Sequence, residues 1–374
     1  MNDKKIYYSF IVNVSYFFFA LFYTAAQLLD KVYEGTTSTL VMIYILAITA
    51  FSMPLLYSGM CGRFMDNGTR LSSSFVYRKI LPPTVIATVL WCFIGTLIYW
   101  KQNFNGDYRL FTLNDSFSSV LRAPSCLFFY PMILLVVILY PFLKSLMEDR
   151  EYMRYMSLIA IAVCLLGSLV AYVSFFPDEL GMMMAFISYI FLAVFVEQTE
   201  FRPAIRIIIY LAGLLATGLM IHMTIRYSVV QSAIDYTWVE EATIFVIIQL
   251  FAVLVLIREL SRRIKTKAKI SYWIREFSSY AYIYILIFAL VTVPLDSAAE
   301  VRNLAVPARF MLDCFGGIVV TLILCSALTR LPVISLYTGG FRDIENLGTF
   351  TRHRHYKKIK KEFERLEDSS SETA

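Results

Sequence analysis

Six ionisable side chains lie in or beside apolar stretches of this 374-residue chain, where a charged group is costly and by default suggests function. They are Asp30, His222, Arg226, Glu240, Glu241 and Asp313. His222 and Arg226 are four residues apart and therefore share one face of a helix. A histidine beside a carboxylate such as Asp313 forms the kind of base that catalysis uses. The alternative interpretation is structural: a histidine bonded to a carbonyl group or water, and an arginine that reaches to lipid phosphate.

Ten apolar stretches, each about as long as a bilayer is thick, must position these groups. They cover roughly residues 7–29, 38–61, 80–100, 121–145, 155–174, 181–198, 205–224, 240–258, 272–294 and 305–328. A barrel strand alternates in polarity, and stretches such as TIFVIIQLFAVLVLI do not. Charged residues make up only 17% of the chain, against about 25% in a soluble globular protein. The sequence therefore predicts an all-α integral membrane protein with about ten transmembrane helices.

The distribution of lysine and arginine predicts how these helices are oriented. If the N-terminus is cytoplasmic, 27 of the 34 Lys and Arg residues fall on the cytoplasmic side. The others are Lys31, Lys101, Arg109, Arg122, Arg226, Arg302 and Arg309. Because this is the positive-inside pattern, we expect both termini in the cytoplasm of a multi-pass protein in the cell (inner) membrane. The six ionisable groups then lie in the outer part of the membrane or at its outer edge. The net charge of +6 indicates topology and contact with anionic membrane lipid, and no nucleic acid partner is expected.

The chain divides into a membrane domain, residues 1–330, and a cytoplasmic tail, residues 331–374. In the tail, apolar residues recur at three- and four-residue spacing between lysines and arginines: Tyr356, Ile359, Phe363 and Leu366. This pattern predicts a short basic amphipathic helix on the inner leaflet, followed by a disordered serine-rich end. The six cysteines show no Cys-x-x-Cys or Cys/His spacing, so neither a metal site nor a disulfide framework is expected.

Four segments carry more specific patterns. The second stretch ends in FSMPLLYSGMCGRFMD, with the pair Ser58-Gly59, and a basic loop, SFVYRKILPP, leads into the third. The fourth stretch reads LFFYPMILLVVILYPFLK and ends near Tyr140 and Pro141, while the ninth carries serine, aromatic and tyrosine residues in REFSSYAYIYILIF. In order and spacing these segments resemble the membrane acyltransferase-3 family, which includes O-acetyltransferases that act on surface polysaccharides. The resemblance covers most of residues 1–330 and agrees with ten spans.

Two positions depart from that family's pattern. Its first span carries a histidine expected to act as general base on the acceptor hydroxyl, but residues 1–221 here contain no histidine. The matching stretch has as its polar groups Asn13, Ser15 and Gln27, and the ninth-span signature, which usually ends in histidine, here ends in Leu286, Ile287 and Phe288. None of these side chains takes a proton near neutral pH. His222 is the only histidine outside the tail and is therefore the leading replacement base, with Asp313 as the second catalytic candidate.

The resemblance implies transfer of an acyl group, most simply acetyl from acetyl-CoA, to a hydroxyl of a cell-surface glycan or its lipid-linked precursor. Arg78 and Lys79 would hold the donor phosphates on the cytoplasmic side, although positive-inside anchors are the commoner role for such residues. The other candidates for donor or substrate binding are Asp30, Arg226, Glu240 and Glu241. No bound cofactor or metal is expected. Two alternatives stay open: a non-catalytic relative that binds or translocates a lipid-linked glycan, and a transporter, for which paired broken helices are not evident.

Overall fold

The computed structural model describes most of the chain, and regular structure in the described part is entirely helical. The described residues are 4–29, 37–68, 73–103, 125–148, 151–152, 155–156, 158–159, 162, 178–231, 234–240, 243–263, 273–274, 276–297, 304–329 and 331. The α-helices are α1 (Lys4–Leu29), α2 (Thr37–Thr49), α3 (Ser52–Gly68), α4 (Ser73–Phe75), α5 (Leu81–Asn103), α7 (Ser125–Ile138), α8 (Tyr140–Glu148), α10 (Asp178–Gln198), α11 (Pro203–Gln231), α12 (Ile244–Arg263), α14 (Ala281–Ser297), α16 (Val306–Met311) and α17 (Gly317–Leu328). Two π-helical turns are η1 (Val76–Ile80) and η3 (Leu312–Gly316).

Five of these helical segments are long and apolar enough to cross a membrane. They are Tyr7–Leu29, Thr37–Met65, Pro203–Val229, Ile244–Arg263 and Val306–Leu328. A sixth arises if α7 and α8, which meet at an angle of 71°, form one broken span. Shorter apolar helices cover Ala185–Gln198 and Ala281–Thr292. The prediction of a helical, multi-pass membrane protein is therefore confirmed in its coarse form. The predicted stretch 155–174 and the tail after residue 331 lie largely outside the described residues.

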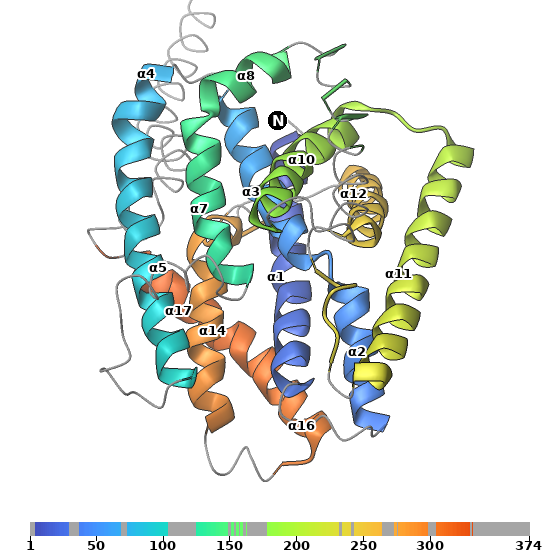
Figure 1. Cartoon of the computed structure of the whole chain (residues 1–374). Helices are drawn as coiled ribbons and strands as arrows, with labels where there is room; N and C mark the ends of the chain where they lie inside the picture. Colours follow the sequence, from blue (N-terminus) through green and yellow to red (C-terminus); the bar gives the residue numbers. More distant parts are fainter. Residues whose placement is uncertain are drawn as a thin grey trace, which may run out of the picture.

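Helix α1 stands at the centre of the bundle, where α2 and α3 run in the opposite direction to it and α14 runs in the same direction (Figure 1). The start of α1 meets the end of α3, where a Cβ added to Gly62 would touch the ring of Tyr8. The start of α11 meets the end of α12, where Arg206 pairs with Glu259. We call the end of the bundle that gathers the starts of α1 and α11 and the ends of α3, α10 and α12 the basic end.

Glycine allows α1 and α3 to approach closely. A Cβ built on Gly59 would lie 2.7 Å from Cγ2 of Ile11 and 2.9 Å from Cγ2 of Val12. Real side chains do not tolerate such distances, so the packing of these two helices depends on the missing side chain. Beyond α3 the core is aromatic: the Tyr57 ring meets Phe186 of α10 edge-on, with ring centroids 4.7 Å apart.

The path from α2 to α3 is interrupted at residues 50 and 51, and α12 compensates for the interruption. Because α2 ends at Thr49, its last carbonyl groups need partners outside the helix. The Gln249 side chain of α12 supplies them, since its Nε2 donates to the carbonyl oxygens of Ala47 at 3.1 Å and Ile48 at 3.2 Å. In an apolar interior every backbone group must be satisfied within the protein, so Gln249 makes the break tolerable.

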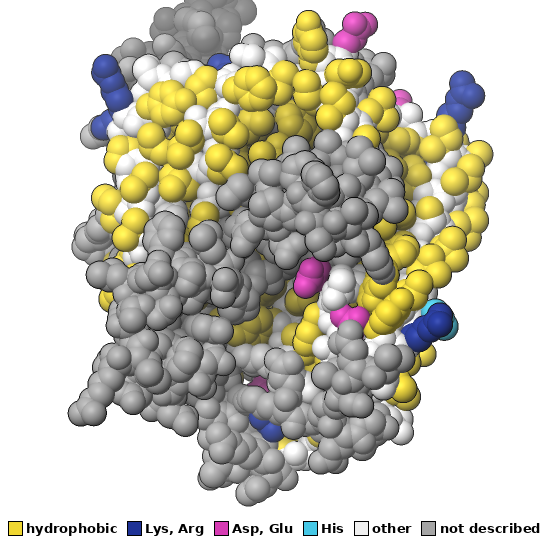
Figure 2. Space-filling model, viewed as in Figure 1, with side chains coloured by type: hydrophobic (Ala, Val, Ile, Leu, Met, Phe, Trp, Pro, Cys, Tyr) yellow, Lys and Arg dark blue, Asp and Glu magenta, His cyan; other side chains and the backbone are white. Residues whose placement is uncertain are grey.

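Helix α11 lies at the edge of the bundle and packs mainly against α12 and α2 (Figure 1). Its outward face is apolar: Ile208 and Leu214 are 65% and 70% exposed. In Figure 2 hydrophobic side chains cover much of the visible described surface at this edge. A continuous apolar face of this size is typical of a surface that contacts lipid.

Candidate functional site

The central helix and the chain before α14 are joined by side-chain donors that reach backbone carbonyls. The Asn13 Nδ2 atom donates to the carbonyl oxygen of Ile274 at 2.7 Å. One turn further along α1, the Tyr16 hydroxyl donates to the carbonyl oxygen of Phe277 at 2.9 Å. These two bonds therefore hold the chain that leads into α14 against α1.

A basic side chain from α3 meets the same segment. The Arg63 guanidinium donates from Nη1 to the Ser278 hydroxyl, and Arg63 is half-buried. The chain turns here before α14 begins, because the amides of Ser279 and Tyr280 bond to the carbonyl oxygens of Glu276 and Phe277. We call Asn13, Tyr16, Arg63, Ser278 and Tyr284 the Arg63 cluster.

Tyr284 closes the Arg63 cluster on the side facing the middle of the bundle. Its ring stacks on the ring of Tyr16 with centroids 4.0 Å apart, and its hydroxyl donates to the Tyr16 carbonyl oxygen at 3.2 Å. The Asn13 Oδ1 atom is buried and accepts no hydrogen bond from the described residues. The cluster thus offers the guanidinium of Arg63, which binds and polarises a carbonyl or phosphate oxygen, and the Oδ1 atom of Asn13, which accepts a hydrogen bond from a hydroxyl or amide; neither side chain accepts a proton at neutral pH.

Asp313, the second predicted catalytic residue, is buried in the π-helical turn η3. Its exposure is 3%, and its Oδ2 atom lies 4.0 Å from Nε of Arg309, one turn earlier. Within the described residues its Oδ1 atom has no hydrogen-bond partner. The turn η3 packs against α1, where the Phe315 ring lies 6.1 Å from the ring of Phe17. A π-helical turn with a buried carboxylate is a frequent feature of functional sites.

His222 and Arg226 lie on α11, and both side chains are exposed. In the described part of the chain His222 makes no hydrogen bond or ion pair, so the structure does not join it to Asp313. Glu240 is exposed after α11, whereas Asp30 and Glu241 lie outside the described residues. Among the described residues, no contact joins His222 or Arg226 to Asp313, and the catalytic role of His222 stays a prediction.

Arg78 and Lys79, predicted to hold the donor phosphates, are exposed in the π-helical turn η1 at the start of α5. A hydrogen bond joins this turn to the end of α7, because the Tyr77 hydroxyl donates to the carbonyl oxygen of Ile138 at 2.9 Å. These two exposed cationic side chains could either anchor η1 at the lipid headgroups or bind a soluble anion.

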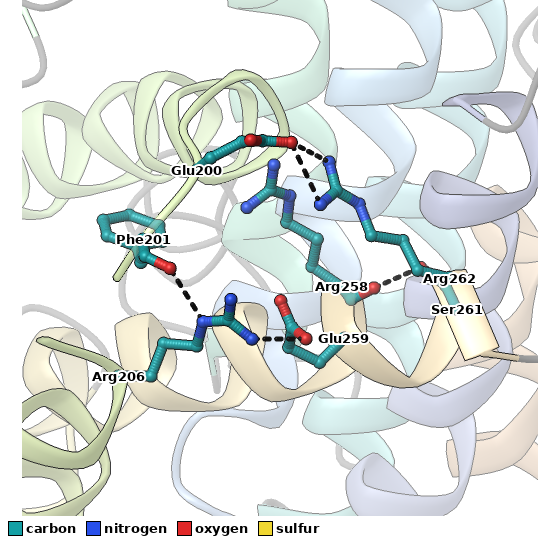
Figure 3. Close-up of polar contacts among 7 residues, drawn as sticks. All are labelled: Glu200, Phe201, Arg206, Arg258, Glu259, Ser261 and Arg262. Carbon is teal, nitrogen blue, oxygen red and sulfur yellow. Dashed lines mark hydrogen bonds and ion pairs between the residues drawn. The ribbon is translucent and has the colours of Figure 1, made fainter. Parts of the chain in front are cut away.

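Ion pairs fasten three helices together at the basic end (Figure 3). Nη1 of Arg206 in α11 lies 2.6 Å from Oε2 of Glu259 in α12, and Nε of Arg206 donates to the carbonyl oxygen of Phe201 at 2.8 Å. Arg262 of α12 reaches Glu200, which follows α10, at 3.4 Å. Most of these groups are partly exposed, so the pairs mainly fix geometry.

Sequence reasoning passed over Arg63 and Ser278, although both lie in segments that carry the resemblance. Arg63 stands in FSMPLLYSGMCGRFMD, close to the end of a span, where an arginine is normally a positive-inside anchor. Only the fold shows that its guanidinium turns to Ser278, which is 215 positions further along the chain.

Comparison with known proteins gives no relative: no family model, curated protein or solved structure matches the chain. Among the described residues, no group of three or more His, Cys, Asp or Glu side chains is arranged to hold a metal ion.

Proposed function

We propose that this chain is a membrane acyltransferase of the acyltransferase-3 type. It transfers an acyl group, most simply acetyl from acetyl-CoA, to a hydroxyl of a cell-surface glycan or its lipid-linked precursor. The proposal includes ten transmembrane spans in the cell membrane, with both termini on the cytoplasmic side. One observation supports it most: the segments that carry the resemblance lie in α3, α5, α7 and α14, and α7 contacts each of the other three. The contact between Arg63 and Ser278 joins two of these segments directly.

The Arg63 cluster and Asp313 lie along the same side of α1. Phe17, which contacts Phe315 of η3, is one helical turn beyond Asn13. Tyr284 stacks on Tyr16, and α14, which carries Tyr284, also contacts the turn η3 that carries Asp313.

We assign the following roles in the proposed acyl transfer. Arg63 binds and polarises the thioester carbonyl. The acceptor hydroxyl attacks the carbonyl carbon, its proton passes to the carboxylate of Asp313, the new C–O bond forms, and the C–S bond breaks. The proton then leaves with the coenzyme A thiolate, which becomes a thiol. Asp313 is favoured over His222 because it is buried in the bundle beside α1.

Acetyl-CoA-dependent acetylation of glycan in membranes with and without the protein tests the proposal. Loss of a general base typically lowers the rate about 100- to 10,000-fold. We expect such a loss in Asp313→Asn and a large loss in Arg63→Gln, with Arg202→Gln, an exposed arginine at the basic end, as the matched control. His222→Ala compares the two bases: if it alone abolishes transfer, the base is His222. Absence of donor hydrolysis and of transfer with every glycan would refute acyl transfer.

A non-catalytic relative that binds a lipid-linked glycan is the second candidate. It is favoured by the first span, where the polar residue Asn13 has its amide nitrogen bonded to a backbone carbonyl and cannot act as a base. Saturable glycan binding by the unmodified protein, without any turnover of acetyl-CoA, would select this function.

A further inference from the structure

Helix α8 turns away from the direction of α7 at the basic end of the bundle. The two helices meet at 71°, and the nine residues of α8 extend only about 14 Å. A turn at residue 139 and Pro141, which has no N–H group, separate them. In Figure 1 α8 lies across the end of the bundle, whereas α7 runs along it. Tyr140 packs against Phe64 near the end of α3, with ring centroids 5.3 Å apart, so α8 covers the basic end.

The outward side of this bend is apolar. We call residues 138–142 the α7–α8 corner. Ile138 is 46% exposed and Phe142 is 62% exposed, whereas Tyr140 between them is buried. A short helix that buries one side against the protein and exposes an aromatic ring at the end of a membrane bundle is typical of a segment in the interface between headgroups and acyl chains.

Two cations lie beside the α7–α8 corner. The Tyr77 hydroxyl donates to the carbonyl oxygen of Ile138 at 2.9 Å, which places η1 against the last residue of α7. Arg78 and Lys79 follow Tyr77 in η1, are exposed, and form no ion pair within the described residues. Ile80, the next residue, is buried. The turn is therefore anchored in the core while its two cationic side chains stay exposed.

The apolar corner decides between a lipid and a soluble anion as the partner of these cations. A soluble anion needs only the two cations, whereas an anionic phospholipid has a phosphate group with apolar chains next to it. Guanidinium and ammonium groups bind phosphate oxygens, and exposed apolar side chains gain by contact with acyl chains. Attraction between basic side chains and anionic lipid also acts close to the membrane surface, where a helix across the end of the bundle is expected.

We propose that η1 and the α7–α8 corner form a binding surface for an anionic phospholipid. Arg78 and Lys79 bind the phosphate group of the headgroup, and Ile138 and Phe142 contact the acyl chains. Helix α8 then lies flat in the headgroup layer and marks the edge of the membrane at the basic end. The proposal does not depend on acyl transfer, and it assigns the two cations to lipid in place of a soluble donor.

The test uses the full-length protein in maltoside detergent, stripped of phospholipid, and three probes. Dihexanoyl phosphatidylglycerol is the anionic lipid, dihexanoyl phosphatidylcholine has the same chains without a net charge, and inorganic pyrophosphate is the soluble anion. We expect calorimetry to show saturable binding of phosphatidylglycerol, about tenfold tighter than that of phosphatidylcholine. The double variant Arg78→Gln/Lys79→Gln should weaken the Kd for phosphatidylglycerol about tenfold or more, because it removes both charge-assisted contacts. Phe142→Ala should weaken it about threefold, because an apolar contact with the chains is lost.

Arg202→Gln and Phe93→Ala are the matched controls. Arg202 is an exposed cation at the same end, and Phe93 is an exposed phenylalanine of α5 outside the proposed surface, so both variants should leave the Kd unchanged. All the substituted side chains are exposed, and size-exclusion chromatography checks that each variant folds; if the double variant does not, Phe142→Ala compared with Phe93→Ala decides the result.

Four results would overturn the proposal. They are the absence of saturable phosphatidylglycerol binding, equal binding of the two lipids, a double variant that binds as tightly as Arg202→Gln, and Phe142→Ala binding as tightly as Phe93→Ala. Saturable binding of pyrophosphate without saturable binding of phosphatidylglycerol would assign the cations to a soluble anion.

Discussion

At the residue scale, single side chains determine how the helices fit together. Asn13, Arg63 and Gln249 each link elements that are distant in the sequence. The sequence identified Asn13 as a polar group of the first span, but Arg63 and Gln249 carry no local pattern that reveals their partners. The sequence alone indicates that a polar side chain within a span is costly and therefore a functional candidate. It does not indicate the partner of that side chain, because the partner depends on which helices become neighbours in the fold.

Gly59 should be essential for the packing of α1 on α3. We expect Gly59→Val to destabilise the protein by about 1–3 kcal/mol, because the added methyl groups would overlap Ile11 and Val12. Thermal unfolding in detergent, followed by size-exclusion chromatography, measures the effect. Gly218→Val is the matched control, since a Cβ at this helical glycine of α11 meets nothing within 4 Å. Equal melting temperatures for the two variants would contradict the close approach.

Gln249 should contribute to stability through the carbonyls that it satisfies. Gln249→Leu keeps much of the volume but leaves the carbonyl oxygens of Ala47 and Ile48 without this donor, and it also removes a 2.9 Å contact with Thr217. We expect a loss of about 1–2 kcal/mol, as for other buried hydrogen bonds in membrane proteins. Gln198→Leu, at the end of α10, removes an amide that donates to no described residue and should leave the melting temperature nearly unchanged.

At the element scale, the apolar stretches predicted where helices lie, because long continuous apolar runs leave the backbone no alternative in lipid. They did not predict the interruption before α3, the 71° angle between α7 and α8, or the π-helical turns η1 and η3. Pro54 and Pro141 mark the first two places, since proline lacks the N–H that continues a helix. The resulting angles depend on packing, such as the contact of Tyr140 with Phe64, whose ring centroids are 5.3 Å apart.

The basic amphipathic helix predicted after residue 351 lies outside the described residues and stays a prediction. A synthetic peptide of residues 352–367 should become helical on anionic vesicles, because its apolar face and its lysines both favour the membrane surface. Circular dichroism measures the change, and added salt should weaken binding by screening the charges. A peptide that binds neutral vesicles equally well would show that the lysines contribute nothing.

At the scale of the whole molecule, the described residues contain five or six helical segments that could cross a membrane, and the ten spans and the position of the termini stay predictions. The basic end gathers Arg63, Arg206, Arg258 and Arg262, as the positive-inside rule requires of a cytoplasmic surface. This grouping was predictable from the sequence, because lysine and arginine cluster in loops that alternate along the chain. The arrangement of the helices around α1 was not, because apolar faces of similar composition do not specify their neighbours.

The orientation is open to a direct experiment. In a cysteine-free background, Lys265→Cys should be protected from an impermeant thiol reagent added to intact cells, and Arg109→Cys should react. The reason is that the loop around residue 265 is strongly basic and is expected inside. Labelling of position 265 in intact cells, with protection of position 109, would invert the topology.

The length of α11 gives the molecule a dependence on bilayer thickness. Its apolar segment, Pro203–Val229, has 27 residues, which at 1.5 Å each extend about 40 Å, against roughly 30 Å of hydrocarbon. A helix that is too long for its bilayer tilts, and α11 has lipid on its outer face to tilt into. The Arg206–Glu259 contact holds the start of α11 to α12. When α11 tilts in a thinner bilayer, the end of α11 that carries His222 and Arg226 is therefore displaced most.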